Sequence, residues 1–318
     1  MEHRLSAAAI EEASRLIDPV FVASRQFQSE SLSSALGCDV TFKDETANPI
    51  RCFKGRGADY FLAKVVERGD ERQLVCASTG NFGQAMAYAC RKHDRPLVVF
   101  ADEGANPVKV SRIAEMGAEV RLEGADFDSA KARAREFSDR TGSWMVEDGH
   151  EPEISEGAGT IALELMEGNR FDTVLIPLGN GALLNGNARW IKEVAPDTEV
   201  IGVSASGADA MARSWREGEI VTRDTVSTIS EGIAVRVPVP AAVSDMAGLV
   251  DEVILVADDS TIDAMRLLHQ HTGLAVEPAA AVGIAALGDE PQRLARKQVA
   301  TILTGANLTE EQTRRWLG

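Results

Sequence analysis

A lysine flanked by glycines is the first group in this sequence that could carry out chemistry. The stretch CFKGRGADYF spans residues 52–61 and places Lys54 after Phe53 and before Gly55. A glycine costs a helix about 1 kcal/mol relative to alanine, so a helix that starts here gives up stability around a single amine. A lysine held among apolar neighbours can act as a Schiff-base amine, whereas a lysine on the first turn of a surface helix is the more common case.

A second candidate is a turn that could hold a phosphate. The stretch LIPLGNGALLNG (175–186) indicates a strand that passes through a glycine-containing turn into a helix. Free N–H groups at a helix start suit an anion, and Gly179 and Gly181 allow the main chain to approach it closely. The turn is neither GxGxxG nor a P-loop, which argues against a dinucleotide or a nucleoside triphosphate. Taken alone, it also fits an ordinary turn between a strand and a helix.

A third candidate is the strand, turn and helix pattern CASTGNFGQAMAYA (76–89). Two hydroxyls, an amide and free N–H groups lie where the helix is expected to start, at Ser78, Thr79, Gly80 and Asn81. Such a group could hold a carboxylate. It could equally be a helix cap, since Ser and Thr before a helix are routine capping residues.

A fourth polar group ends a late strand. In ILTGAN (302–307) the hydroxyl of Thr304 could donate to a ring nitrogen, although a capped turn explains the same residues. The four candidates together supply an amine, a phosphate site, a carboxylate site and a hydroxyl, all near strand and helix junctions. Pyridoxal phosphate is a cofactor that uses all four when it binds an amino-acid substrate.

The elements that would position these groups alternate along the chain. Strands are predicted over 39–45, 73–78, 96–101, 118–124, 143–148, 172–177, 199–205, 251–258 and 299–303, and helices over 54–68, 81–92, 107–117, 127–140, 157–167 and 182–194. Nearly continuous apolar strands alternating with helices predict parallel sheets covered on both faces, in a doubly wound α/β architecture. Ligands in such folds bind at the carboxyl ends of the strands.

The composition of this 318-residue chain argues against several kinds of binding partner and site. The 49 acidic and 33 basic residues give a formal charge of −16, which disfavours nucleic-acid and anionic-membrane surfaces. Cys38, Cys52, Cys76 and Cys90 form no CxxC pair, so we expect reduced, buried thiols rather than disulfides or a zinc site. The N-terminus lacks an apolar signal core, and no apolar run reaches the roughly 20 residues of a membrane span. We therefore expect a cytoplasmic protein.

Four motifs in order along the chain resemble those of one enzyme family. SFKxRGA corresponds to CFKGRGA (52–58), SxGNHxQ to STGNFGQ (78–84), a glycine-rich phosphate loop to GNGAL (179–183), and SGxN to TGAN (304–307). With these motifs the chain resembles the fold type II pyridoxal-phosphate enzymes, in the branch of threonine/serine dehydratases and serine racemase. The resemblance extends over nearly the whole chain.

The resemblance implies an α/β fold with two doubly wound open-sheet domains, like the β subunit of tryptophan synthase. Residues 1–70 and 149–318 would form a large domain that binds pyridoxal 5′-phosphate. Residues 71–148 would form a small mobile domain that closes on it and excludes water. Family members are usually dimers, so a homodimer is expected.

The resemblance also implies residue roles. Lys54 would bind the cofactor as an imine and, once released, remove the substrate Cα proton. The other cofactor contacts would come from Phe53 beside the ring, Asn81 at the 3′-oxygen, Thr304 at the pyridine nitrogen, and the backbone of Gly179, Asn180, Gly181, Ala182 and Leu183 around the phosphate. The substrate carboxylate would be held by Ser78, Thr79, Gly80, Asn81 and Phe82.

For activity, the resemblance implies a lyase. A neutral hydroxyl opposite the ring nitrogen leaves that nitrogen largely unprotonated and favours prompt loss of a β-substituent. The expected reaction is β-elimination from a β-hydroxy or similarly substituted amino acid, giving a 2-keto acid and ammonia. The alternatives are an amino-acid racemase or β-replacement synthase, and, from another class, a non-catalytic protein that binds a phosphorylated metabolite.

The sequence departs from the family pattern at several positions. Cys52 replaces a serine and Phe82 a histidine. Ser204 and Ala210 stand where many relatives have carboxylates that bind a divalent cation, so no metal is expected. The hydroxyl of Thr79 could return a proton to Cα and permit racemisation, or could simply cap the helix. No regulatory domain follows residue 318, so the feedback control of longer threonine dehydratases is not expected.

Overall fold

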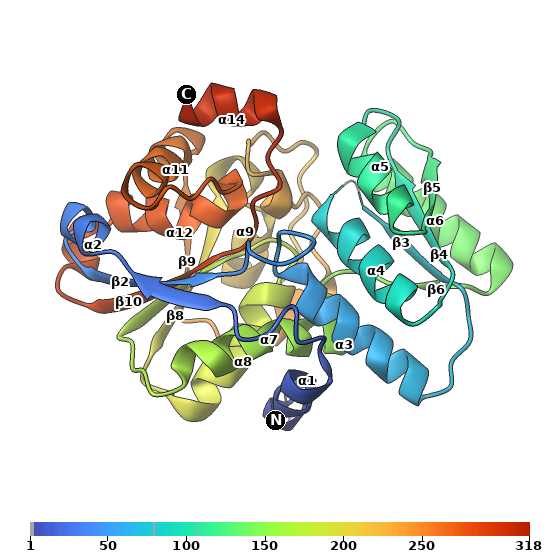
Figure 1. Ribbon diagram of the computed structural model, residues 1–318, viewed down its shortest axis with the longest axis horizontal. Helices are drawn as coiled ribbons and strands as arrows, with labels where there is room; N and C mark the ends of the chain where they lie inside the picture. The colour runs from blue at the N-terminus through green and yellow to red at the C-terminus, as the bar shows by residue number, and fades with distance from the viewer. Residues whose placement is uncertain (1–2, 79, 106) are drawn as a thin grey trace.

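The computed structural model describes residues 3–78, 80–105 and 107–318, so Thr79 lies outside the described residues. Within them the chain forms two open sheets flanked by helices (Figure 1). The larger sheet has the strand order β1 (Arg25–Gln28), β2 (Asp39–Asp44), β10 (Gln298–Leu303), β7 (Thr173–Pro177), β8 (Glu199–Ala205) and β9 (Glu252–Val256). The smaller sheet has the order β5 (Glu119–Leu122), β4 (Leu97–Ala101), β3 (Leu74–Ala77) and β6 (Trp144–Met145).

The predicted fold class is confirmed, with one exception in strand direction. Neighbouring strands in both sheets are parallel, except that β1 runs antiparallel to β2. The sequence analysis did not predict β1. Its residues RQFQ are mostly polar and only partly buried, as suits a short edge strand, and they lack the apolar run that identifies a central one.

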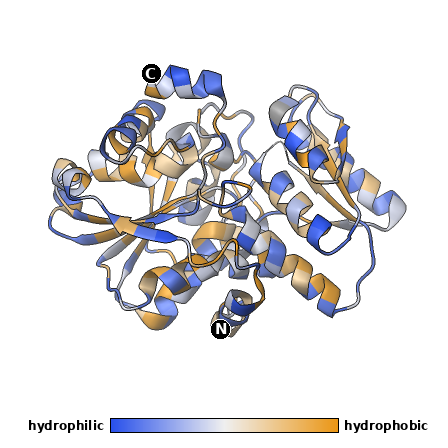
Figure 2. Ribbon diagram, viewed as in Figure 1, coloured by the Kyte–Doolittle hydropathy of each residue, from blue (hydrophilic) through white to orange (hydrophobic). Residues whose placement is uncertain are grey.

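Helices cover both faces of the larger sheet (Figure 1). Helices α7 (Pro152–Met166) and α8 (Ala182–Val194) lie on one face, and α11 (Asp258–Thr272) and α12 (Pro278–Asp289) on the other. Because side chains alternate along a strand, Leu175 of β7 packs with the α12 side, whereas Val174 and Ile176 pack with the α8 side. The central strands of both sheets are accordingly apolar, and hydrophilic residues collect on the outward helix faces (Figure 2).

The smaller sheet is covered in the same way. Helices α4 (Asn81–Lys92) and α5 (Pro107–Glu115) lie on one face and α6 (Phe127–Thr141) on the other. Helix α3 (Lys54–Glu67) packs against both α4 and α7, so it connects the two halves of the molecule. The remaining helices are α1 (Ala7–Leu16), α2 (Glu30–Leu36), α9 (Ala210–Glu217), α10 (Pro240–Asp245), α13 (Pro291–Leu294) and α14 (Glu310–Leu317), with short 3-10 turns η1 (Ser206–Ala208) and η2 (Glu231–Ile233).

Two predicted elements differ from the observed ones by more than two residues at one end, and the others agree within two residues. Strand β6 is limited to Trp144–Met145, and α7 begins at Pro152 instead of residue 157. A proline at the first helical position starts a helix well, because its missing N–H would have had no partner there. All four cysteines are buried and free, as expected. Among the described helices, none is both long and apolar enough to cross a membrane.

Candidate active site

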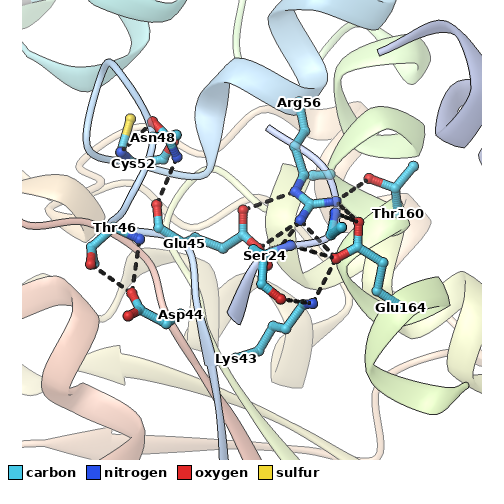
Figure 3. A network of polar contacts seen from close by, with 12 residues as sticks. Ser24, Lys43, Asp44, Glu45, Thr46, Asn48, Cys52, Arg56, Thr160 and Glu164 are labelled. Carbon is cyan, nitrogen blue, oxygen red and sulfur yellow. Dashed lines mark hydrogen bonds and ion pairs between the residues drawn. The ribbon is translucent and has the colours of Figure 1, made fainter. Parts of the chain in front are cut away.

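The start of helix α3 is fixed by Arg56, two residues beyond Lys54 (Figure 3). This fully buried guanidinium donates to Glu45 at 2.8 Å through Nε and Nη2, and to Glu164 at 2.6 Å through Nη1. Lys43 donates to the same Glu164 at 2.6 Å. Hydrogen-bonded carboxylates on both sides compensate for the buried positive charge, as a buried ion requires.

The glycines around Lys54 have a packing reason within the protein itself. A Cβ at Gly57 would lie 2.4 Å from the carbonyl oxygen of Ile154 in α7, and a Cβ at Gly55 would lie 2.3 Å from the ring of Phe21. Glycine at these positions therefore lets α3 approach its neighbours closely. The sequence analysis identified the helix-propensity cost but not the contacts that explain it.

We expect the ion pairs of Arg56 to stabilise the protein less at low pH, because Glu164 then becomes protonated. Burial by itself raises the pKa of Glu164, but the hydrogen bonds and charges of Arg56 and Lys43 outweigh burial and lower it from 4.5 to about 2. Because the pKa of Glu164 is lower in the folded than in the unfolded protein, its ionised carboxylate stabilises the folded state. This stabilisation is complete above the unfolded pKa and is lost as the pH falls from about 4.5 toward about 2. A shift of this size corresponds to roughly 3 kcal/mol.

Urea unfolding of wild type and Glu164→Gln at about pH 6 and about pH 3 measures this contribution. We expect the difference in unfolding free energy between the two proteins to be about 2 kcal/mol smaller at the lower pH. A difference that stays constant over this range would show that Glu164 keeps no depressed pKa in the folded state.

Lys54 lines a cavity of about 550 Å³ whose residues come from the segments of both sheets. Its Nζ forms an ion pair with the carboxylate of Asp148. The same nitrogen lies 5.1 Å from the centre of the Phe53 ring and 5.7 Å from that of Phe82, within range of cation–π attraction. The side chain is 16% exposed, so the amine is neither fully buried nor on an open helix surface.

A smaller recess adjoins this cavity and also reaches Lys54; we call it the cofactor recess. Its lining includes all nine residues predicted to contact a cofactor: Phe53, Lys54, Asn81, Gly179, Asn180, Gly181, Ala182, Leu183 and Thr304. Asp148, Gly232 and Glu277 line both hollows. Residues from seven separate parts of the chain therefore meet at one place, beside the carboxyl ends of strands β3, β6, β7 and β10.

The turn between β7 and α8 presents N–H groups that have no partner among the described residues. The N–H of Leu178 is used in the sheet, where it donates to Val203 at 2.8 Å. The N–H groups of residues 179–183 make no hydrogen bond to any other described residue. Gly181 has a φ of 95°, which a residue with a side chain rarely adopts. Unpaired donors at the start of α8 fit the phosphate of a cofactor.

The start of α4 is capped by Ser78 and also leaves two N–H donors that are unpaired within the described part of the chain. The hydroxyl of Ser78 accepts from the N–H groups of Gly80 at 3.2 Å and Gly83 at 2.9 Å, so it caps the helix. The N–H groups of Asn81 and Phe82 make no bond to another described residue. These two donors at a helix start can therefore take a carboxylate.

Asn81 is held by a chain of hydrogen bonds. Its amide nitrogen donates to Glu277 at 2.6 Å, and its oxygen accepts from Asn307 at 2.8 Å. The bond between Asn81 and Asn307 connects α4 to the segment after β10, and Asn307 also donates to the carbonyl of Ile50 at 2.8 Å. Thr304, at the same strand end, is buried, and its carbonyl accepts from the N–H of Phe53 at 3.0 Å.

Two carboxylates at the site were not identified from the sequence. Asp148 follows the strand predicted at 143–148, and a polar residue at the carboxyl end of a strand was the available signal. Glu277 is the only charged residue in the apolar run 274–287. Burial raises the pKa of Glu277, with the hydrogen bond from Asn81 acting in the opposite direction.

The region where many relatives bind a cation has a different composition here. Ser204 donates weakly to the carbonyl of Ala208 at 3.4 Å, and Asp209 is paired with Arg223. No cluster of three or more potential metal-binding side chains occurs among the residues that the structure describes.

Comparisons with known proteins agree with this geometry. The sequence matches the family described as "Pyridoxal-phosphate dependent enzyme" over residues 24–305. It is 31% identical over 300 residues to the L-threonine ammonia-lyase of Thermotoga maritima, which covers 94% of this chain and 75% of that protein. Maize serine racemase superposes with a TM-score of 0.91 at 25% identity, covering 98% of this chain and 96% of that one. The processed form of threonine deaminase isoform 2 from Solanum lycopersicum gives 0.89 at 26% identity, covering 99% and 90%.

The family match spans most of the chain and includes the lysine, the phosphate turn and the strand-end hydroxyl. The cofactor is accordingly pyridoxal 5′-phosphate, and the unpaired N–H groups of residues 179–183 are suited to its phosphate. The chain belongs to the pyridoxal-phosphate dependent enzymes, in the branch that contains threonine ammonia-lyases and serine racemases.

Proposed function

We propose that this enzyme catalyses β-elimination from an amino acid with a β-hydroxyl or similar leaving group, and releases a 2-keto acid and ammonia. The observation that carries the proposal is the convergence of Lys54, the phosphate turn and Thr304 on one recess, beside a cavity large enough for an amino acid. The similarity to L-threonine ammonia-lyase supports elimination as the main reaction.

In this proposal the backbone and side chains of the protein bind and orient the substrate and transfer its proton. The N–H groups of Asn81 and Phe82 hold the substrate carboxylate at the start of α4. Bound pyridoxal phosphate supplies a ring that withdraws electrons from the substrate. The Nζ of Lys54 takes the Cα proton, and the resulting positive charge lies next to Asp148. Thr304 offers the ring nitrogen a neutral hydroxyl.

We further propose that residues 71–148 form a small mobile domain. Two ion pairs cross the cavity between that segment and residues 231–236: Lys109 with Glu231 at 2.8 Å, and Arg236 with Asp128. Side chains of both pairs line the cavity, so these contacts would hold the small domain closed over it and exclude water from the substrate, and opening would break them. A cytoplasmic location and a homodimer complete the proposal.

Product analysis tests the proposed function against its nearest alternatives. Purified enzyme with pyridoxal phosphate should convert L-threonine or L-serine, or an analogue with another β-substituent, to keto acid and ammonia in equal amounts. The same reactions are analysed for the D-enantiomer and, with a thiol added, for a thioether. An enantiomer without keto acid would favour a racemase, and a thioether as the main product would favour a β-replacement synthase.

A further inference from the structure

Asp148 is a buried carboxylate whose only ion-pair partner among the described residues is Lys54. The residue is 8% exposed, and Oδ2 accepts from the lysine Nζ. Its second oxygen, Oδ1, is buried and has no hydrogen-bond partner within the described part of the chain. Since a buried carboxylate is costly without a cation or donor, Asp148 depends on the charge at position 54.

The backbone places Asp148 at this position through its neighbour. Gly149 has a φ of 87°, and a Cβ there would lie 2.3 Å from the carbonyl oxygen of Asn180. Only glycine fits both the conformation and the approach. The segment after β6 therefore packs closely against the phosphate turn, and Asp148 forms part of the lining of the cofactor recess.

The other charged and titratable groups around Lys54 do not replace Asp148. Cys52 is fully buried, and burial raises the pKa of its thiol to about 12, so it stays neutral. Glu277 accepts from Asn81, and burial raises its pKa. The other cavity lysines, Lys109 and Lys131, are paired with Glu231 and Glu147. Asp148 is thus the acidic group in direct contact with the amine.

We propose that Asp148 is a positioning residue that keeps the proton, and with it the positive charge, on the Lys54 nitrogen while that nitrogen is bound to the cofactor. The inference rests on the proposed function insofar as Lys54 holds the cofactor. Condensation of the ammonium group with the aldehyde forms a C=N bond and releases one water, which takes the aldehyde oxygen and two of the three N–H protons. The third proton and the positive charge remain on nitrogen, so the ion pair with Asp148 is kept.

A spectral pH titration tests this inference. Wild type and Asp148→Asn are loaded with pyridoxal phosphate, and the visible absorbance of the lysine–cofactor linkage is followed as the pH is raised. An adjacent opposite charge stabilises a charged group by about 1 to 3 pKa units, so the linkage should lose its proton about 1 to 3 pH units lower in Asp148→Asn. Asp148→Glu keeps the charge and should titrate close to wild type.

Two comparisons make the outcome decisive. Asp126→Asn removes a carboxylate that also lines the cavity but faces Arg236, and it should leave the titration unchanged. If Asp148→Asn titrates like wild type, or if Asp148→Glu is shifted as far as Asp148→Asn, the inference is wrong while the proposed function stands. If wild type forms no linkage that borohydride can fix to Lys54, the proposed function itself fails and this inference fails with it. Should Asp148→Asn not fold, the Asp148→Glu titration still decides, because a large shift with the charge retained contradicts the proposal.

Discussion

Replacing Lys54 with alanine should abolish covalent attachment of pyridoxal phosphate and lower turnover by about 10³-fold or more. The substitution removes both the amine that binds the cofactor and the group that takes the substrate proton, and positioned proton transfer alone is worth about 10²- to 10⁴-fold. Borohydride reduction followed by mass spectrometry measures attachment, and keto-acid release measures turnover. We expect the variant to fold, because alanine favours the helix start that Lys54 occupies.

Lys131→Ala is the matched control. Lys131 also lines the large cavity and is paired with an acidic residue, Glu147, yet it is absent from the lining of the cofactor recess. Its removal should leave attachment intact. If borohydride fixed the cofactor equally well in Lys54→Ala, another amine would be responsible, and the assignment of the recess would be wrong.

The sequence predicted the structure correctly where the pattern that identifies an element lies within the element itself. Each segment predicted as a strand contains a strand, and the glycine turn at 179–181 lies between β7 and α8 as predicted, because a buried strand that runs into a glycine turn has few other structures available. Strand β1 was missed because edge strands need no apolar run.

The site was less predictable where it depends on tertiary contacts. Lys54 and Asp148 are 94 residues apart, and no local pattern links them. Their contact depends on how the segment after β6 packs against the phosphate turn, which Gly149 permits. Likewise, the glycines beside Lys54 could be recognised as costly from the sequence, but the contacts with Phe21 and Ile154 that require them appear only in the folded structure.

Replacing Arg56 with alanine should destabilise the protein by about 3–5 kcal/mol, the typical cost of breaking a buried ion pair from one side. The side chain is fully buried, and its loss would leave Glu45 without a cation and Glu164 with Lys43 alone. Arg56→Lys should recover only part of the loss, because an ammonium group cannot reproduce the forked contacts to both carboxylates. Urea unfolding, followed by circular dichroism, measures the change in unfolding free energy.

Arg133→Ala provides the control, since this arginine is largely exposed and, among the described residues, forms its one ion pair with Glu136 in the next turn of α6. An exposed pair of this kind contributes about 0.2–1 kcal/mol, so the control should unfold almost as wild type does. The Arg56 variant should also bind the cofactor less well at temperatures where it remains folded, because the network that fixes Arg56 also fixes the first turn of α3 and with it the backbone of Lys54. If both arginine variants lost similar stability, the buried network would not be what holds the lysine in place.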